Sequence, residues 1–146
     1  MNFCVKTFSG YWASHGDPFG PSFLLDPAVD DETLGWAVEE ALEKSRYVFP
    51  TDDDEFSTSE KREKYYFDLA ETIRVRFSYK SIRSLFKGDK FCYITSLDGI
   101  LTIAPYRRER LHVHEQLAED QFVVVSELAT PARLGSQVRL AISRCL

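Results

Sequence analysis

The sequence predicts an α+β fold in a single domain covering residues 1–146, with an antiparallel or mixed β-sheet and helices packed mainly on one face. A length of 146 residues suits one core rather than two. Apolar residues make up 44% and aromatic residues 14% of the chain, which is enough to fill that core. Strand-like segments near residues 3, 75, 92, 102 and 124 are interspersed with helical ones, as an α+β fold requires.

The N-terminal segment predicts a short strand followed by a loop. Residues 2–8 (NFCVKTF) alternate partially, with Phe3 and Val5 apolar. Residues 10–23 contain three glycines, two prolines and four large aromatic side chains. This composition predicts a loop, and the aromatic side chains require that it lies over the core rather than in water.

The first helix is predicted from Asp30 or Asp31, whose carboxylate can accept hydrogen bonds from the first turn, to about Tyr47. Pro50 forbids continuation. Apolar or small side chains recur at helical spacing, namely at Leu34, Val38, Ala41, Leu42 and Ser45. Glu39, Glu40 and Glu43 lie on the opposite side, and residues 51–59 are predicted to form an acidic, exposed loop.

The middle of the chain allows two interpretations that overlap near Ile73. Residues 60–72 have helical spacing, whereas residues 73–79 alternate like a strand with Val75 and Phe77 on one face. Residues 81–86 predict a short helical or turn segment. The boundary between the second helix and the strand is therefore predicted only to within several residues of Ile73.

The C-terminal part predicts a hairpin, a strand and a helix. Residues 90–95 and 100–104 are strand-like, and Asp98-Gly99 supplies the positive φ of a tight turn. We expect Pro105 to end the pairing. Residues 122–126 (FVVVS), apolar on both faces, predict a central strand. Thr130 and Pro131 then begin a helix that runs to the end of the chain.

Two of the predicted helices share the pattern L-G-x-x-V-x-x-A-[LI]. Leu34-Gly35 begins it in the first helix and Leu134-Gly135 in the last. Because glycine inside a helix costs about 1 kcal/mol relative to alanine, its occurrence at the same point in both suggests that each backbone approaches a neighbour closely there. The alternative is coincidence, since amphipathic helices draw on few residue types.

No catalytic, metal-binding or cofactor-binding motif is apparent, so we expect no enzyme, metal or cofactor. His112 and His114 would face the same side of a strand but lack a clear third metal ligand, which favours an exposed loop or edge strand. Cys4, Cys92 and Cys145 lie in apolar patterns typical of inert buried thiols. The cysteine usage, together with the lack of a signal peptide or membrane span, predicts a cytoplasmic protein with reduced thiols.

Charge is unevenly distributed along the chain. Residues 26–63 contain 13 acidic and 4 basic side chains, and residues 74–110 contain 9 basic and 3 acidic ones. The run Asp52-Asp53-Asp54-Glu55 predicts either a solvated loop or an electrostatic lure for a basic partner. The basic stretch 74–110, interleaved with aromatic residues, leaves open an alternative function as a small RNA-binding module.

The order of features from about residue 33 onward resembles the immunity proteins of bacterial contact-dependent growth inhibition (CDI) systems. The resemblance lies in residues 34–46, in Tyr79-Lys80-Ser81 with Leu85 and Lys87, in Cys92 and Tyr93, in Asp98-Gly99-Ile100 with residues 103–105, and in Leu134-Gly135 with the helix to Cys145. It implies a small cytoplasmic protein without catalysis that binds its own toxin domain 1:1 and blocks the toxin's active site. Such toxins are commonly nucleases.

The resemblance fixes no binding residue, so the toxin-binding surface is predicted from charge alone. A nuclease must present a positively charged cleft, and clustered carboxylates would complement it. The predicted toxin-binding residues are Glu39, Glu40, Glu43, Asp52, Asp53, Asp54 and Glu55.

Overall fold

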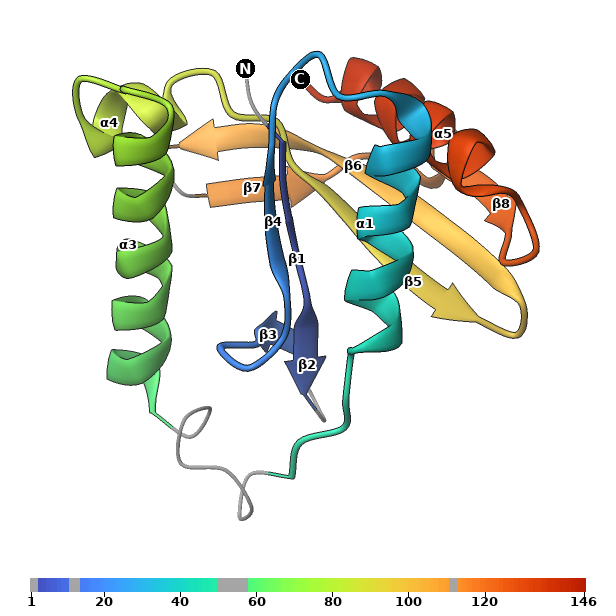
Figure 1. Cartoon of the computed structure of the whole chain (residues 1–146), viewed down its shortest axis with the longest axis horizontal. Coiled ribbons are helices and arrows are strands. Elements are labelled where there is room, and N and C mark those ends of the chain that lie inside the picture. Colours follow the sequence, from blue (N-terminus) through green and yellow to red (C-terminus); the bar gives the residue numbers. More distant parts are fainter. Residues whose placement is uncertain (1–2, 11–13, 50–57, 111–112) are drawn as a thin grey trace. The chain divides into compact units, whose positions relative to one another are not determined.

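The computed structural model describes residues 3–10, 14–49, 58–110 and 113–146 (Figure 1). The described chain divides into two compact units: a C-terminal unit drawn from residues 28–36 and 86–146, and an N-terminal unit drawn from residues 2–27 and 37–85. Helix α1 (Asp31–Glu43) begins in the former and ends in the latter. Helices and antiparallel sheets confirm the α+β class. One domain over residues 1–146 stays a prediction.

The C-terminal unit is built around one long strand. Its strands are β5 (Cys92–Leu97), β6 (Ile100–Arg110), β7 (Val113–Gln116) and β8 (Val123–Ser126), with a 3₁₀ turn at Glu119–Gln121 before β8. All three other strands pair antiparallel with β6. The predicted hairpin is confirmed: Leu97 pairs with Ile100 across Asp98 and Gly99, whose φ angles are 50° and 79°.

Two predictions for this sheet are wrong. Pro105 does not end the pairing, because it pairs with Cys92 and its carbonyl accepts a hydrogen bond from the Leu117 amide at 3.0 Å. Proline lacks only the donor, so β6 continues to Arg110. Strand β8 is not central: among the described strands it pairs only with β6, and its Val124 is 62% exposed.

Helix α5 (Pro131–Arg144) packs against β6 and β8 and begins as predicted. The Thr130 side chain accepts a hydrogen bond from the Arg133 amide at 3.3 Å. The buried face of the helix includes Leu134 and Val138. On the sheet, the side chains of Val123 and Val125 are buried. This layer of helix on sheet forms the core of the C-terminal unit.

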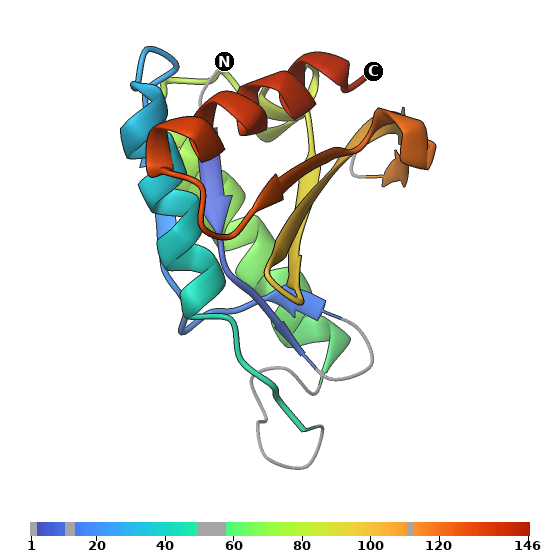
Figure 2. The same cartoon turned by 90° about the vertical axis from the view of Figure 1, so that its right-hand side faces the viewer.

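The two glycines of the repeated pattern bring the starts of α1 and α5 into direct contact (Figure 2). A Cβ atom on Gly35 would lie 1.8 Å from the carbonyl oxygen of Pro131, and one on Gly135 would lie 1.8 Å from the carbonyl oxygen of Asp31. Each glycine therefore admits the first turn of the other helix. The predicted close approach is confirmed, and it is reciprocal.

The N-terminal unit contains two short antiparallel pairs. Its strands are β1 (Phe3–Lys6), β2 (Phe8–Gly10), β3 (Ser14–Gly16) and β4 (Ser22–Leu25). Strand β1 pairs with β4, and β2 pairs with β3. The prediction of one loop over residues 10–23 is wrong, because these pairings place β3 and the start of β4 inside it.

The second helix of the sequence is longer than predicted. Helix α3 (Ser59–Arg76) includes residues 73–76, so the strand expected near residue 75 is wrong. Ile73 is buried on the helix whereas Val75 is 62% exposed, which a shared strand face would not produce. The short helix α4 (Ile82–Phe86) is confirmed.

Helix α1 is capped by Asp30, whose Oδ1 accepts a hydrogen bond from the Thr33 amide at 2.7 Å. The helix ends at Glu43 rather than near Tyr47 as predicted.

Candidate functional site

The predicted acidic face lies on the second half of α1, within the N-terminal unit. Glu39 and Glu40 are half-buried and Glu43 is exposed. Glu43 follows Glu39 by four residues and Glu40 by three, so the three side chains share one side of the helix. None of them forms an ion pair with another described residue. Asp52, Asp53, Asp54 and Glu55 lie outside the described residues.

A shallow depression of about 510 Å³ borders this face. It is lined by Asp17, Phe19, Gly20, Pro21, Glu40, Lys44 and Arg46. Glu40 is the predicted site residue that the structure brings to it. Lys44 follows Glu40 by one helical turn, so the rim is of mixed charge rather than purely acidic.

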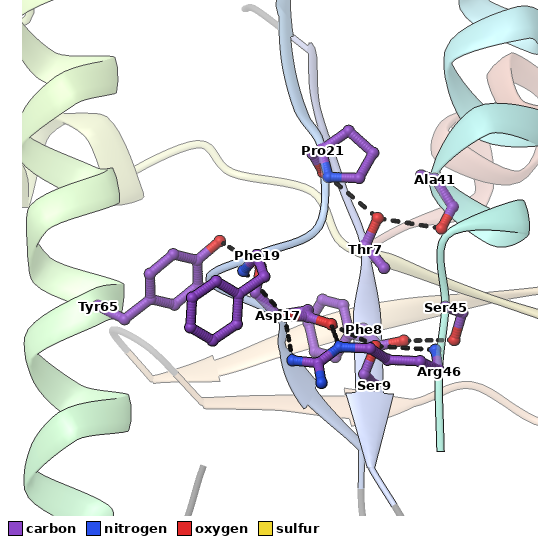
Figure 3. A network of polar contacts seen from close by, with 10 residues as sticks. All are labelled: Thr7, Phe8, Ser9, Asp17, Phe19, Pro21, Ala41, Ser45, Arg46 and Tyr65. Carbon is purple, nitrogen blue, oxygen red and sulfur yellow. Dashed lines mark hydrogen bonds and ion pairs between the residues drawn. The ribbon is translucent and has the colours of Figure 1, made fainter. Parts of the chain in front are cut away.

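The floor of the depression is a buried carboxylate with several donors (Figure 3). Asp17 is 1% exposed and accepts hydrogen bonds from the Ser9 hydroxyl at 2.8 Å and the Phe19 amide at 2.9 Å. Arg46 donates to both carboxylate oxygens, with Nε at 2.8 Å and Nη2 at 3.2 Å. Burial acts to raise the pKa of Asp17, but the hydrogen bonds from Arg46, Ser9 and the Phe19 amide outweigh it and lower that pKa.

The same network ties the β2–β3 hairpin to the segment that follows α1. The Arg46 amide donates to the Ser9 hydroxyl at 3.1 Å, and the Ser45 hydroxyl donates to the Phe8 carbonyl at 2.6 Å. On α3, the Tyr65 hydroxyl donates to the Asp17 carbonyl at 3.3 Å (Figure 3). The β2–β3 hairpin, the segment after α1 and helix α3 therefore all contribute hydrogen bonds around the depression, and its shape does not depend on a single contact.

Phe19 is presented at the rim by this network. Its ring is 68% exposed and lies over the Arg46 guanidinium, whose central carbon is 5.4 Å from the ring centroid. Its amide is held by the Asp17 carboxylate. A large aromatic side chain that is held in place by neighbouring contacts and exposed to solvent is typical of the residues that contribute most binding energy in protein interfaces. The sequence predicts Phe19 in a loop over the core, and no local pattern predicts its exposure at the rim.

The basic, aromatic stretch 74–110 is shared by both units, with residues 74–85 in the N-terminal unit and residues 86–110 in the C-terminal unit. Several of its cations are engaged within their own unit. Arg74 pairs with Glu71 at 2.6 Å, Arg107 pairs with Glu115, and Arg108 lies 3.5 Å from Asp89. These contacts reduce the charge available to a nucleic acid.

The histidines and cysteines are the remaining candidates for metal binding or nucleophilic chemistry. His112 lies outside the described residues, and the Nε2 of His114 lies 3.3 Å from an Asp89 oxygen. In the part of the chain that the structure describes, no group of three or more His, Cys, Asp or Glu side chains is placed to hold a metal ion. Cys4 is exposed, contrary to the expectation of burial.

Among the described helices none is both long and apolar enough to cross a membrane. A family model of CDI immunity proteins, CdiI, matches residues 2–145. The chain belongs to the CdiI family. The predicted resemblance is thereby confirmed, and it extends over nearly the whole sequence, including the N-terminal segment that the resemblance had not covered.

Individual proteins agree with this assignment. The chain is 35% identical over 156 residues to the immunity protein CdiI-YPIII of Yersinia pseudotuberculosis serotype O:3 (strain YPIII), covering 97% of this chain and 88% of that protein. It is similar to a solved chain of a CdiA-CT/CdiI toxin and immunity complex from Yersinia pseudotuberculosis, with a TM-score of 0.92, 33% identity and coverage of 99% and 91%. A Neisseria meningitidis protein of unknown function has a TM-score of 0.91 and 31% identity, with coverage of 99% and 89%.

Proposed function

We propose that this CdiI protein binds a cognate CdiA-CT toxin domain in a 1:1 complex in the cytoplasm and neutralises it by covering its active site, without catalysis of its own. The observation that carries the proposal is the match, in fold and over almost the full length, to a chain of a toxin and immunity complex. The family match over residues 2–145 supports it. The toxin is proposed to be a nuclease.

We place the acidic face of α1 and the acidic residues 52–55 against the toxin. Glu39, Glu40 and Glu43 form no ion pairs with described residues and are therefore available to a partner. A nuclease needs a positive surface to hold a polyanionic substrate. Carboxylates grouped on one helix face and on residues 52–55 would complement that surface and keep the substrate away from it.

The depression beside this face would contribute the part of the binding free energy that charged groups alone do not supply. Exposed ion pairs contribute little net affinity, whereas a well-supported aromatic side chain in the centre of an interface contributes much of it. Phe19, which is fixed by Asp17 and Arg46, fills that role.

The test is to purify the CdiA-CT domain encoded beside this protein and mix the two. We expect a 1:1 complex by native mass spectrometry and loss of the toxin's nuclease activity on RNA or DNA at equimolar protein. The non-cognate toxin domain of another CDI system is the control and should stay active. Tight binding that leaves nuclease activity intact would contradict active-site blocking, and a toxin without nuclease activity would contradict the proposed toxin class.

A further inference from the structure

Two cysteines from distant parts of the sequence meet in the C-terminal unit. Cys92 begins β5 and Cys145 directly follows α5, and their sulfur atoms are 3.5 Å apart although 53 positions separate them in the chain. A disulfide bond requires about 2.05 Å. Both residues are free thiols in this structure. The two sulfur atoms would therefore have to move about 1.5 Å closer together to form the bond. Cys145 lies just beyond the last turn of α5.

The surroundings favour a thiolate at one of the two sulfurs. The two sulfur atoms share a hydrogen bond in which either can be the donor, and this contact is the main cause that lowers the pKa of Cys145 against the opposing effect of burial, with a further contribution from the charge of Lys90. Lys90 is held near the end of α5 because its Nζ donates to the Ile142 carbonyl at 3.2 Å. The pKa of Cys92 is raised by the same hydrogen bond and by burial. The hydrogen bond between the sulfurs and the nearby charge of Lys90 stabilise a thiolate at this pair while the neighbouring sulfur keeps its proton.

We propose that Cys92 and Cys145 form an oxidisable pair that hydrogen peroxide converts into an intramolecular disulfide. The Cys145 thiolate attacks one peroxide oxygen, the O–O bond breaks, and a sulfenic acid forms while the departing hydroxide takes a proton to become water. The Cys92 sulfur then displaces the sulfenic oxygen, which leaves with the Cys92 proton as a second water. Two electrons pass from the two sulfurs to one peroxide molecule.

The disulfide would join the end of α5 to β5, the strand paired with the central strand β6. Closing a loop of this length reduces the freedom of the unfolded chain, and we expect the melting temperature to rise by roughly 5–10 °C. The pair would therefore convert an oxidising condition into a more stable C-terminal unit.

The experiment exposes the full chain to hydrogen peroxide and measures the intact mass under non-reducing conditions, followed by peptide mapping. We expect a loss of 2 mass units, from two protons, and one cross-linked peptide pair containing residues 92 and 145. Cys4→Ser, which removes the third thiol, is the matched control and should behave like the parent protein. Cys92→Ser should instead accumulate a sulfenic acid that dimedone traps at residue 145.

Two outcomes would overturn the proposal. One is oxidation of Cys92 and Cys145 to separate sulfenic or sulfinic acids without a cross-link in the folded protein. The other is a disulfide that contains Cys4, because this would show that the proximity of the other two sulfurs does not direct the reaction. Circular dichroism of each variant before oxidation keeps misfolding apart from loss of reactivity.

Discussion

Asp17 is the residue on which the candidate site depends most, and its charge state can be tested. Asp17→Asn keeps the shape of the side chain but removes the charge that faces the bidentate Arg46. We expect a loss of about 2 kcal/mol in the free energy of unfolding at pH 7, because the variant leaves buried donors poorly matched while Arg46 stays partly in water. Urea denaturation measures it.

The pH dependence of that difference follows from the lowered pKa of Asp17. A carboxyl whose pKa is lower in the folded state stabilises the protein above its unfolded pKa of about 3.9, and this contribution is lost as the pH falls through the folded value. The gap between the parent protein and Asp17→Asn should therefore narrow below about pH 4. Asp68→Asn is the control, since the pair that Asp68 forms with Lys64 is exposed to solvent and should contribute little to stability at any pH. A gap that is constant down to pH 3 would contradict a charged Asp17.

Phe19 provides the second test at this scale. Because its ring is mostly exposed, Phe19→Ala should leave the melting temperature nearly unchanged and weaken binding to the cognate toxin domain by about 10-fold or more. Leu128→Ala, which removes a side chain that is 94% exposed in the C-terminal unit, is the control. Calorimetric titration measures both affinities. Equal affinities of the two variants would place the interface away from the depression.

Of the residues that line the depression, Glu40 is among the predicted toxin-binding residues, whereas Phe19, Asp17 and Arg46 are not. The acidic face of α1 is visible in the sequence because helical spacing places neighbouring carboxylates on one side. The Asp17–Arg46 pair joins residues 29 positions apart, and no local pattern predicts which hairpin carboxylate meets which arginine. The exposure of Phe19 depends on that pair, so this exposure could not be predicted from the sequence either.

At the scale of elements, the contact between α1 and α5 gives the sharpest expectation. Gly35→Ala should improve intrinsic helix propensity by about 1 kcal/mol. The new Cβ would, however, overlap sterically with the Pro131 carbonyl group. Backbone cannot rotate away as a side chain can, so the helices must separate. We expect a net loss of at least about 2 kcal/mol in the free energy of unfolding, and more for Gly35→Leu.

The matched control for this prediction is Gly88→Ala in the same unit. A Cβ at Gly88 meets nothing within 4 Å, so the change should stay within about 0.5 kcal/mol. Chemical denaturation of both variants decides the matter. If Gly35→Ala were as stable as the parent protein, the shared L-G pattern of the two helices would have no packing role.

Elements with local signals were predicted well, and those set by distant pairing were not. The Asp98-Gly99 turn and the caps Asp30 and Thr130 are chemical signals that act within a few residues, and all three are present in the structure. Strands β3 and β4 exist because β2 and β1 pair with them. The alternation over residues 73–79 resembled a strand because it crosses a helix end, where Ile73 is buried and later residues leave the helix.

The molecule as a whole is expected not to bind RNA, although the stretch 74–110 is basic. Arg74 pairs with Glu71, Arg107 pairs with Glu115 and Arg108 lies 3.5 Å from Asp89, so part of the positive charge is neutralised within the protein. Fluorescence anisotropy with a structured RNA should detect no salt-sensitive binding at micromolar protein. A steep decrease of affinity with salt would instead indicate several phosphate contacts and favour the RNA-binding alternative.

The acidic surface should govern how fast the protein meets its toxin. Neutralising the α1 carboxylates (Glu39→Gln, Glu40→Gln, Glu43→Gln) should slow association with a basic toxin domain at low salt. The same is expected when the acidic run at residues 52–55 is neutralised (Asp52→Asn, Asp53→Asn, Asp54→Asn, Glu55→Gln). Replacing both sets should slow it by about 10-fold or more, and the dependence on salt should flatten. Stopped-flow mixing at two salt concentrations measures this. Carboxylates at the rim should change association alone, whereas any that become buried and paired should also accelerate dissociation.

A second triple variant separates the effect of where the carboxylates lie from the effect of net charge on the association rate. Asp98→Asn, Glu119→Gln and Asp120→Asn remove the same charge from exposed positions of the C-terminal unit. Steering depends on the field near the docking surface, and that field decays within about 10 Å at 0.1 M salt. The α1 triple should therefore slow association more than this control at 0.1 M salt. If the two triples slow it equally, the long-range charge of the whole protein attracts the toxin and the face of α1 does not guide docking.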